Sequence, residues 1–562
     1  MATLRQYFSL RDSVRADVAK VHSYSDSSSG TSTPEEKASA LIPGIQISRP
    51  DEQDGSVTFL VGWKDCDAHN PQNWSRPKKW FCTVATCLIA LAITIPGTID
   101  APVSDAFNEH YGVGAIAGSM TTGKSTVWNF NDRQLILVPL AGMYLIGVGF
   151  GSLFVGPVSE TFGRNLVYFT NLAIFMLFVM GKALAPNYGA AIVFRFLTGF
   201  FGAAPMTVAG GTVGDLWNPL ELTFSLPFVT LASYSGPILG PIIGAYIPGS
   251  TFKWVDWISL IIAGAVFIFV AIFQPETYGP LLLQWRAKHL RDQTGDSRYQ
   301  VDEYASASSL GRRLLVNVYR PFQMTYTEPI ILVFSFYLVL LYIVLFTFLN
   351  GFPFIFTNTY GISTSLTYVI FVSMLAGDAV ALVLIPILYR WTKQAAAKAA
   401  AEGKALQAEV SLYWAMVGGS ILMPISLFWM GWTCYVSRHW LVLRNPNITD
   451  RRTQPGVSIW SPIISTFVFG YSLVTIFTAT YLYICFVYTT YAGSALAFVS
   501  FSRYVISGAL LPASVPMYQH MTPHWVLTMV GILATIMAPV PFLLYRYGHR
   551  IRAMSKHVQN KA

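Results

Sequence analysis

Three ionisable residues lie inside long apolar stretches of this chain, where charge is rare. Arg195 follows the run GAAIVF, Asp378 interrupts FVSMLAGDAVALVLIPIL, and Arg503 lies in FSRYVISGALLP. In hydrocarbon a charge costs at least about 2.5 kcal/mol unless it is paired or faces water, so such residues mark substrate or ion pathways. We take Arg195 and Arg503 as candidates for substrate contact or proton coupling, and Asp378 as a candidate proton carrier. The alternative for Arg195 is a structural tie between helices.

The segment GSMTTGKS (118–125) fits the phosphate-binding pattern GxxxxGK[ST]. Such a loop needs a buried strand before it, a helix after it and an acidic partner for magnesium. Here the segment follows AFNEHYGVGAIA, beyond the outer end of the first apolar run. We therefore interpret it as a chance match, and we expect no enzymatic activity, no cofactor and no metal site.

The composition indicates that lipid is the solvent for most of the chain. Of 562 residues, 53% are hydrophobic and only 12% are charged, with a mean hydropathy of +0.47. A soluble protein of this length needs far more charge to cover its surface. The five cysteines show no CxxC spacing, which indicates neither a zinc site nor a disulfide framework. The net charge of +9 is explained by basic clusters beside the apolar runs, so we expect no nucleic-acid partner.

Apolar runs of about 20 residues, each long enough to cross a bilayer, recur from Trp80 onward. We count twelve, with the longest polar break at 275–328. The prediction is an all-α polytopic membrane protein with twelve transmembrane helices in two six-helix bundles, the fifth and eleventh runs being broken by glycine and proline. The expected units are a disordered cytoplasmic tail (1–79), an N-terminal bundle (80–274), a central cytoplasmic loop (275–328), a C-terminal bundle (329–546) and a cytoplasmic tail (547–562). A weak amphipathic helix at 3–21 is the alternative for the start of the tail.

Basic residues set the expected orientation. Clusters lie before the first run, after the eighth and after the twelfth, and loops rich in lysine and arginine stay on the cytoplasmic side. Both termini are therefore expected in the cytoplasm, in a multi-pass protein of the plasma membrane. Asp100, at the outer end of the first run, is expected to be an exposed helix-end residue.

Two further patterns concern helix contacts. In GPVSETFGRN (156–165), between the second and third runs, an acid and a guanidinium at a turn can clasp neighbouring helix ends. In SGPILGPIIGAYI (235–247), glycines at i, i+4 and i+8 give one smooth face on which another backbone can approach closely. The expected gating residues are Gly156, Glu160, Gly163 and Arg164. The glycine-rich helix has Gly236, Pro237, Gly240, Pro241 and Gly244, and its face suits a rocking interface.

These two segments, with RFLTGFFGAAP (195–205), resemble motifs of the major facilitator superfamily. Further matches resemble its fungal twelve-span drug:proton antiporters, a branch that includes multidrug, polyamine and organic-acid exporters. They are NPQNWSRPKKW (70–80), GGTVGDLWNPLE (210–221), QPETYGPLLLQWRAKHLR (274–291), SLFWMGWT (426–433) and YAGSALA (491–497). The resemblance covers roughly 60–555. It departs at Glu160, where most members have Asp, and at Asn165, where many have a second base.

The resemblance implies a proton-coupled exporter of a drug or secondary metabolite, working by alternating access. The alternative is an organic-acid exporter or facilitator. A polyamine exporter is less favoured, because Phe486 and Asn350 occupy positions where polyamine-exporting relatives carry acids, while Arg195 and Arg503 remain to meet an anion. Tyr481 is a candidate substrate contact, with Tyr337, Tyr342, Phe352 and Tyr491 as other pocket aromatics. The expected partners are the substrate, protons and the bilayer, and the expected state is a monomer.

Two segments have no counterpart in the relatives that the motifs resemble. They are 124–142 and 436–454, each about nineteen residues. Each can be encoded with a splice donor at its start, a branch site within it and an acceptor at its end, so we interpret both as translated introns. The alternative is a pair of genuine outer loops. The sequence does not distinguish these, nor does it identify the substrate or the stoichiometry.

Overall fold

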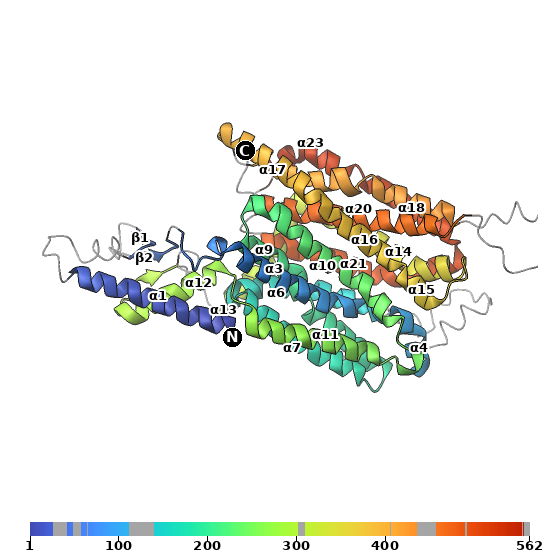
Figure 1. Cartoon of the computed structure of the whole chain (residues 1–562), viewed down its shortest axis with the longest axis horizontal. Coiled ribbons are helices and arrows are strands. Elements are labelled where there is room, and N and C mark those ends of the chain that lie inside the picture. Colours follow the sequence, from blue (N-terminus) through green and yellow to red (C-terminus); the bar gives the residue numbers. More distant parts are fainter. Residues whose placement is uncertain are drawn as a thin grey trace, which may run out of the picture.

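The structure is a computed structural model that describes residues 1–25, 42–48, 58–64, 66–111, 140–301, 310–404, 406–434, 457–488, 492–553 and 555. Within these residues, twelve helical segments are long and apolar enough to cross a membrane. The predicted all-helical, twelve-span fold is therefore confirmed. Figure 1 shows the spans as one elongated bundle, with α1, β1, β2 and α12 beyond its left end and α4 and α15 at its right end. We call these ends the terminal face and the opposite face.

The first six spans make the N-terminal half. Their helices are α3 (Arg76–Thr94), α6 (Leu140–Phe162), α7 (Arg164–Ala183), the pair α8 (Tyr188–Phe201) and α9 (Ala204–Leu216), α10 (Pro219–Gly244) and α11 (Trp254–Phe273). The first span continues through the short turns η2 (Ile95–Gly97) and η3 (Ala101–Val103) into α4 (Ser104–His110), on the opposite face.

The last six spans make the C-terminal half. Their helices are α14 (Pro329–Phe352) with the π-turn η7 (Pro353–Thr357), α15 (Thr364–Val369) with α16 (Phe371–Val380), η8 (Ala381–Leu384) and α17 (Ile385–Ala401), η9 (Ala408–Leu412) with η10 (Ala415–Gly419) and α18 (Leu422–Thr433), α20 (Trp460–Val487), α21 (Ala492–His520), and α22 (Pro523–Met537) with α23 (Val540–Ala553). The linker between the halves contains α12 (Gly279–Thr294) and α13 (Leu310–Thr327).

Each half is held together by the same kind of glycine contact between its second and fourth spans. A side chain on Gly147, Gly151 or Gly199 would overlap the backbone of the partner helix in the α6–α8 pair. Gly377 and Gly470 are in the same situation in the α16–α20 pair. Small residues let helix backbones approach closely in a membrane, where no hydrophobic effect drives helices together. The same glycine contact thus occurs at corresponding positions in the two halves.

The halves meet along α6 and α21, which contact each other from Glu160 and Gly493 to Gly142 and Gly508. Near the terminal face, a Cβ on Gly156 would lie 3.9 Å from the Cβ of Ala497. Toward the opposite face, a Cβ on Gly508 would lie 3.1 Å from the Cβ of Leu145. The two helices are therefore in contact both near the terminal face and toward the opposite face.

A second contact between the halves joins α10 to the eighth span. At the opposite face, the Ser365 hydroxyl donates to the Ala245 carbonyl over 3.0 Å. At the terminal face, the rings of Phe224 and Tyr389 lie edge to face with centroids 5.7 Å apart. In the described residues the halves thus contact each other near both faces, along α6–α21 and along α10 and the eighth span.

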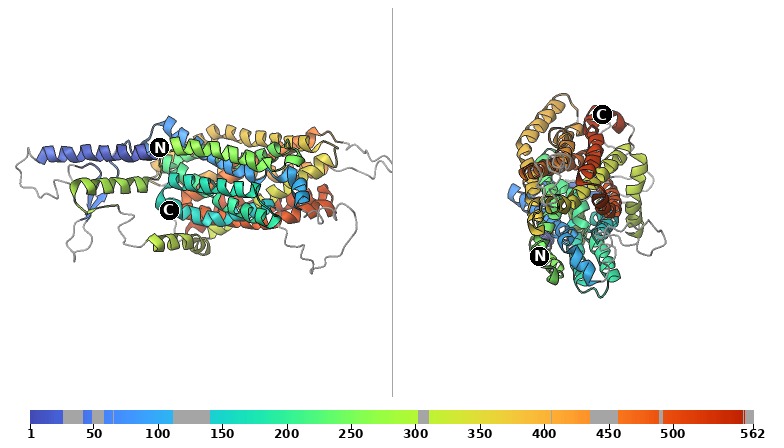
Figure 2. Two further views of the ribbon diagram at one scale, coloured as in Figure 1. Left: turned by 90° about the horizontal axis from the view of Figure 1, so that it is seen from below. Right: turned by 90° about the vertical axis from the view of Figure 1, so that its right-hand side faces the viewer.

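The start of the chain differs from the predicted disordered tail. Residues Ala2–Ser25 form α1, which packs on α12, and β1 (Ile45–Ser48) pairs antiparallel with β2 (Thr58–Val61), which pairs parallel with β3 (Tyr299–Gln300). The left-hand view of Figure 2 shows α1 and α12 projecting together from the bundle. Val14 and Val18, one helical turn apart, share a core with Ala287 and Leu290. The tail has too few apolar residues for a core of its own, but the linker supplies the other half.

The expected breaks in the fifth and eleventh spans are absent from the described helices. Both α10, with Pro227, Pro237 and Pro241, and α21, with Pro512 and Pro516, run without interruption. Interruptions lie in other spans instead, for example in the fourth, between α8 and α9. Proline is tolerated in a membrane helix where a neighbour satisfies the carbonyl that it leaves unpaired. The Thr98 hydroxyl donates over 3.0 Å to the Pro237 carbonyl, the group that the missing N–H of Pro241 leaves free.

Replacing Thr98 with valine is expected to lower the free energy of unfolding by about 1–2 kcal/mol. The change keeps the side-chain shape but leaves the partly buried Pro237 carbonyl without its donor. Thermal unfolding of the purified protein in detergent measures the effect. The control is Thr170→Val, because the Thr170 hydroxyl bonds only within its own helix, to the carbonyls of Leu166 and Val167. Equal unfolding temperatures for both variants would contradict the assignment.

Candidate functional site

Two small adjoining cavities lie between the halves, midway along the bundle. Their volumes are about 30 and 20 Å³, which is space for one or two water molecules each. They share Met206 and Ser233 from the N-terminal half and Tyr342 and Tyr504 from the C-terminal half. Their walls come from α3, η2, α6, α9 and α10 on one side and α14, α20 and α21 on the other. Relative movement of the halves would therefore enlarge this space.

Arg503 and Tyr481, two of the sequence-predicted candidates, meet at the second cavity. Both side chains line it, and Arg503 Nη2 donates to the Tyr481 hydroxyl over 2.9 Å. The guanidinium carbon lies 4.7–5.4 Å from the ring centres of Tyr342, Phe477, Tyr481 and Tyr504. Arginine is attracted to aromatic faces at such distances. The structure thus surrounds this cation with rings from three helices.

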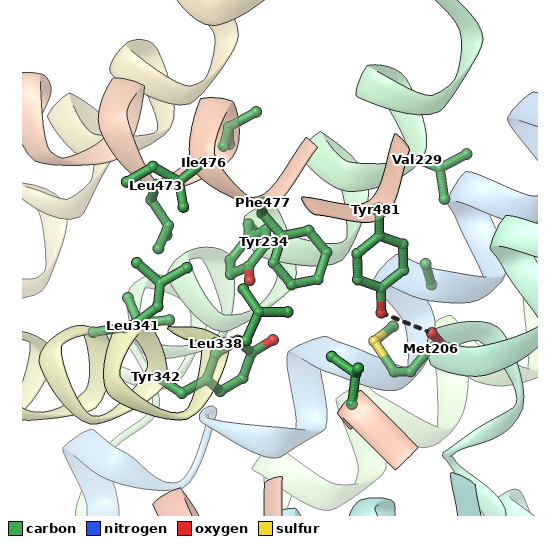
Figure 3. Close-up of a cluster of buried hydrophobic side chains, with 14 of the residues drawn as sticks. Met206, Val229, Tyr234, Leu338, Leu341, Tyr342, Leu473, Ile476, Phe477 and Tyr481 are labelled. Carbon is green, nitrogen blue, oxygen red and sulfur yellow. Dashed lines mark hydrogen bonds between the residues drawn. The ribbon is translucent and has the colours of Figure 1, made fainter. Parts of the chain in front are cut away.

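The same hydroxyl connects the two halves. Tyr481 on α20 donates over 3.4 Å to the Met206 carbonyl on α9. Figure 3 shows this bond, and shows the rings of Tyr234, Tyr342 and Phe477 converging beside it from α10, α14 and α20. Of the other aromatic candidates, Tyr342 lines both cavities, whereas Tyr337 and Phe352 line neither. Tyr491 lies outside the described residues.

Arg195 is not part of this group. Its Nη2 lies 2.9 Å from Asp100 Oδ2 and donates over 3.1 Å to the Gly97 carbonyl, and its guanidinium lies 5.0 Å from the Tyr144 ring centre. Gly97 and Tyr144 both line the first cavity. Arg195 therefore lies behind the wall of that cavity and is held there by an acid.

A buried ion network extends from Arg195 toward the opposite face. Lys182 Nζ donates to both Asp100 oxygens over 2.9 Å and to Asp256 Oδ1 over 2.8 Å. Asp100 is 13% exposed, so the expectation of an exposed helix-end residue is wrong, and the reason is that two cations fold over it. Sequence reasoning missed Lys182 and Asp256. Lys182 reads as an ordinary lysine in the last turn of its helix, and only the tertiary fold brings it to the acids.

Asp378 lies away from both cavities. It is fully buried on α16, facing α20, where a Cβ on Gly470 would lie 3.0 Å from its Oδ1. Neither carboxyl oxygen has a hydrogen-bond partner among the described residues. A charged carboxylate without partners is very costly in such a site, so the arrangement favours a protonated side chain. Asp378 can thus hold a proton, but at a distance from Arg503.

The predicted gating residues lie at the terminal face of the N-terminal half. Gly163, with φ of 95°, turns the chain between α6 and α7 in a conformation that favours glycine. Arg164 Nε donates to Asp215 Oδ2 over 3.1 Å, and its Nη1 donates to the Ser159 hydroxyl over 2.6 Å. This places the guanidinium across the ends of three helices.

Glu276 completes this terminal-face network and was not predicted as a site residue. Its Oε1 accepts the backbone N–H groups of Arg164, Thr277 and Tyr278 over 2.9–3.0 Å, and its Oε2 accepts that of Asn165 over 3.1 Å. The carboxylate therefore caps the start of α7, where the helix dipole favours negative charge. Burial raises the pKa of Glu276 and outweighs the opposing effect of these N–H groups. The QPET and GDLW segments were noted for their resemblance, but no role was assigned to their acids.

Glu160 and Gly156 face the other half. A Cβ on Gly493, at the start of α21, would lie 2.5 Å from Glu160 Oε1. The carboxyl group therefore lies at the N-terminal end of α21, an end that favours an anion. This contact joins the two halves at the terminal face.

The glycine face of α10 packs within its own half and not between the halves. A Cβ on Gly236 or Gly240 would crowd Thr94 and Thr98, and one on Gly244 would crowd the Ile99 backbone. The partner is the first span, α3 with η2. Pro237 and Pro241 lie on the same helix, and Pro237 lines the first cavity. The expected close backbone approach is present, but its partner is the first span.

The positions noted for missing acids do not line the cavities. Asn350 donates to the Ser514 hydroxyl over 2.7 Å, and Phe486 packs against the main apolar core. The GSMTTGKS segment and the two intron candidates, except for 140–142 at the start of α6, lie outside the described residues.

Comparisons with known proteins agree with this architecture. Residues 81–512 match the Major Facilitator Superfamily. The chain is 38% identical to the MFS-type transporter kojT of Aspergillus flavus over 524 residues, covering 92% of this chain and 86% of the relative. It is 31% identical to the ascochitine biosynthesis cluster MFS transporter of Didymella fabae, covering 88% and 89%. Among solved structures it is similar to the proton:xylose symporter XylE, with a TM-score of 0.53 at 12% identity, covering 84% and 96%.

Proposed function

This chain belongs to the Major Facilitator Superfamily, and on that premise we propose that it exports a small secondary metabolite by alternating access in exchange for protons. The family is non-enzymatic, so the chain is a membrane transporter and not an enzyme. The observation that carries the proposal is the space between the halves. It is lined by both halves, which also contact each other near both faces. A transporter needs such a space, opened to one side at a time.

Export of a metabolite is supported by the kind of relative that the chain is similar to. One relative is named for a biosynthesis cluster, and clusters of that kind make secondary metabolites. The resemblance of the α10 glycine motif to drug:proton antiporters points in the same direction. An organic-acid exporter or facilitator remains the second candidate, favoured by the cation at the second cavity. No acidic residue lines either cavity in the described part of the chain, which disfavours a polyamine.

We propose that residues outside the cavities carry out proton coupling. Asp378 lies on a helix pair of the C-terminal half, and its unpartnered carboxyl group can take up and release a proton. The Asp100–Lys182–Asp256–Arg195 network connects the opposite face to the wall of the first cavity. Protonation of Asp100, the carboxylate that pairs with Arg195, would weaken that network and release Arg195. We propose that proton entry from the opposite face acts through this step.

We propose the plasma membrane as the location, with the terminal face in the cytoplasm and the chain acting as a monomer. The basic residues that flank the first, eighth and twelfth spans lie at this face, as the positive-inside tendency requires. They are Arg76, Lys78, Lys79, Arg390, Lys393, Arg546, Arg550 and Arg552.

Reconstitution into proteoliposomes with an imposed pH gradient tests the proposal. Radiolabelled organic acids, polyamines and drugs are screened for transport, and a pH-sensitive dye inside the vesicles reports proton movement. The expected result is that substrate and protons cross the membrane in opposite directions, and that substrate transport is faster with the pH gradient than without it. Asp378→Asn should keep substrate exchange but lose acceleration by the gradient. Transport that is indifferent to the gradient would favour the facilitator, and loss of every substrate alike with Arg195→Ala would assign Arg195 to coupling.

A further inference from the structure

Arg503 is the exception among the buried cations of this protein. In the described part of the chain, seven lysine and arginine side chains are buried. Six of them have a carboxylate oxygen within 4.0 Å, and Arg503 has none. The paired cations are Lys79, Arg164, Lys182, Arg195, Arg286 and Arg552. A buried charge without a counterion is expensive, so its presence calls for an explanation.

The surroundings of Arg503 compensate its charge only in part. The residue is 1% exposed, and its one hydrogen bond to another side chain is to the Tyr481 hydroxyl. The four rings around it attract the cation, but aromatic faces supply no hydrogen-bond acceptors in the plane of the guanidinium. Its Nε and Nη1 groups have no hydrogen-bond partner among the described residues. Two charged donors are therefore left unused at a buried site.

These donors belong to a side chain that lines a cavity. The second cavity is bordered by Arg503, Tyr481 and Tyr504, and its volume of about 20 Å³ accommodates a group of the size of a carboxylate oxygen. The Tyr234 hydroxyl on α10, which is also buried and has no hydrogen-bond partner among the described residues, belongs to a residue that lines the adjoining first cavity. Tyr234 belongs to the N-terminal half and Arg503 to the C-terminal half. Donors from both halves thus lie at two adjoining cavities, and no acidic residue lines either cavity in the described part of the chain.

We propose that this space binds the carboxylate of an organic anion with an aromatic or conjugated body, with Arg503 as the charge partner and the Tyr234 hydroxyl as a second donor. The inference deepens the proposed function and rests on it for the step of transport. An anion is the one class of ligand that completes the unused donors and neutralises the charge. The rings of Tyr342, Phe477 and Tyr504 provide flat apolar walls for the body of the ligand. A cationic ligand would face Arg503 with no acid to offset it.

Arg195 is excluded from this role by its contacts. Its guanidinium already pairs with Asp100 and the Gly97 carbonyl, so an anion would have to displace a carboxylate to reach it. From the sequence, Arg195 and Arg503 are equivalent candidates for binding an anion. In the structure Arg195 already has a carboxylate partner and Arg503 has none among the described residues.

The test is ligand binding to the full-length chain in nanodiscs, in chloride-free buffer. The probes are benzoate and cinnamate, each compared with its neutral amide, and benzylammonium as the cation. Binding is measured as the concentration-dependent rise in Tm. We expect the carboxylates alone to raise Tm. Arg503→Gln should weaken their affinity about 10- to 100-fold, which corresponds to loss of hydrogen bonds to a charged group. The control is Arg390→Gln, an exposed arginine of the same half, which should bind like the unaltered chain.

Two further variants guard against a folding defect. Because Arg503 has no acid partner to orphan, Arg503→Gln without ligand should unfold at or above the Tm of the unaltered protein. Tyr234→Phe removes one hydroxyl and should weaken carboxylate binding several-fold while sparing the fold. The proposal is overturned if no carboxylate raises Tm more than its amide, or if the rise survives Arg503→Gln.

The same reagents separate this proposal from the proposed function. Binding of carboxylates through Arg503, without gradient-driven transport of them in proteoliposomes, would keep the anion site and reject proton-coupled export. Gradient-driven transport of neutral or cationic compounds at unchanged rates in Arg503→Gln would keep export and reject the anion site.

Discussion

Replacing Lys182 with methionine is expected to lower the free energy of unfolding by about 3–5 kcal/mol, the cost of removing one partner from a buried ion pair. Lys182 is 2% exposed and is the only cation within 4.0 Å of Asp256 among the described residues. Asp100 would keep Arg195, whereas Asp256 would be left as a buried carboxylate without a counterion. Equilibrium unfolding in mixed micelles measures the loss.

A second substitution distinguishes charge from packing. Adding Asp256→Asn to Lys182→Met removes the orphaned charge, so the double variant is expected to recover most of the lost stability. Lys404→Met is the control, because Lys404 forms an exposed pair with Glu402 and its removal should leave the unfolding transition unchanged. A Lys182→Met protein as stable as the unaltered chain would show that the network does not hold the N-terminal half together.

Replacing Gly377 with alanine is expected to destabilise the C-terminal half by about 3 kcal/mol or more, the upper end of the cost of overpacking. A methyl group there would overlap the Phe467 carbonyl oxygen and approach the Tyr471 backbone nitrogen to 3.0 Å. Neither atom can move away without separating α16 from α20. The yield of monodisperse protein and its unfolding temperature report the effect.

Gly214→Ala is the matched control for Gly377→Ala. Gly214 also lies in a membrane helix, but a Cβ there would have no neighbour within 4 Å. Because alanine favours a helix by about 1 kcal/mol over glycine, this variant should be as stable as the unaltered chain or more so. Similar behaviour of the two alanine variants would mean that the α16–α20 contact is looser than the structure has it.

The membrane spans could be predicted from the sequence because the bilayer fixes their length and their apolar composition. The candidate residues could be found only where chemistry and hydrophobic context conflict. Arg195, Asp378 and Arg503 stand out in the sequence for that reason. Which of them has a partner in the folded protein cannot be read from the sequence. Arg195 is paired with Asp100, whereas Arg503 is surrounded by four aromatic rings and has no acid beside it among the described residues. Both environments are built by helices that lie far apart in the chain.

The start of the chain and the ion networks show what local reasoning misses. Val14 and Val18 look too sparse for a core, because Ala287 and Leu290, which complete it, come some 270 residues later. Glu276 lies in a loop segment and reads as a solvated acid, yet it caps α7. In each case the missing information is a partner supplied by another element. The prolines of α10 led to the opposite error, a predicted break that is absent. The Thr98 hydroxyl donates to the Pro237 carbonyl, so the helix continues although Pro241 has no N–H.

The central claim is that the space between the halves opens to one side at a time. Ser233 lines both cavities, so Ser233→Cys in a background without the five native cysteines reports access to that space. A disulfide between Gly156→Cys and Ala497→Cys would lock the terminal face, where their Cβ atoms would be 3.9 Å apart, within the range for a disulfide. A disulfide between Ala245→Cys and Ser365→Cys would lock the opposite face.

The decisive measurement is labelling of Ser233→Cys by a membrane-impermeant maleimide, in sealed vesicles of both orientations, after each lock has formed. With the terminal face locked, we predict labelling only from the side of the opposite face. With the opposite face locked, we predict labelling only from the terminal side, and reduction of either disulfide should restore labelling from both sides. Labelling from the same side in both locked forms, or from neither side after reduction, would contradict alternating access through this space.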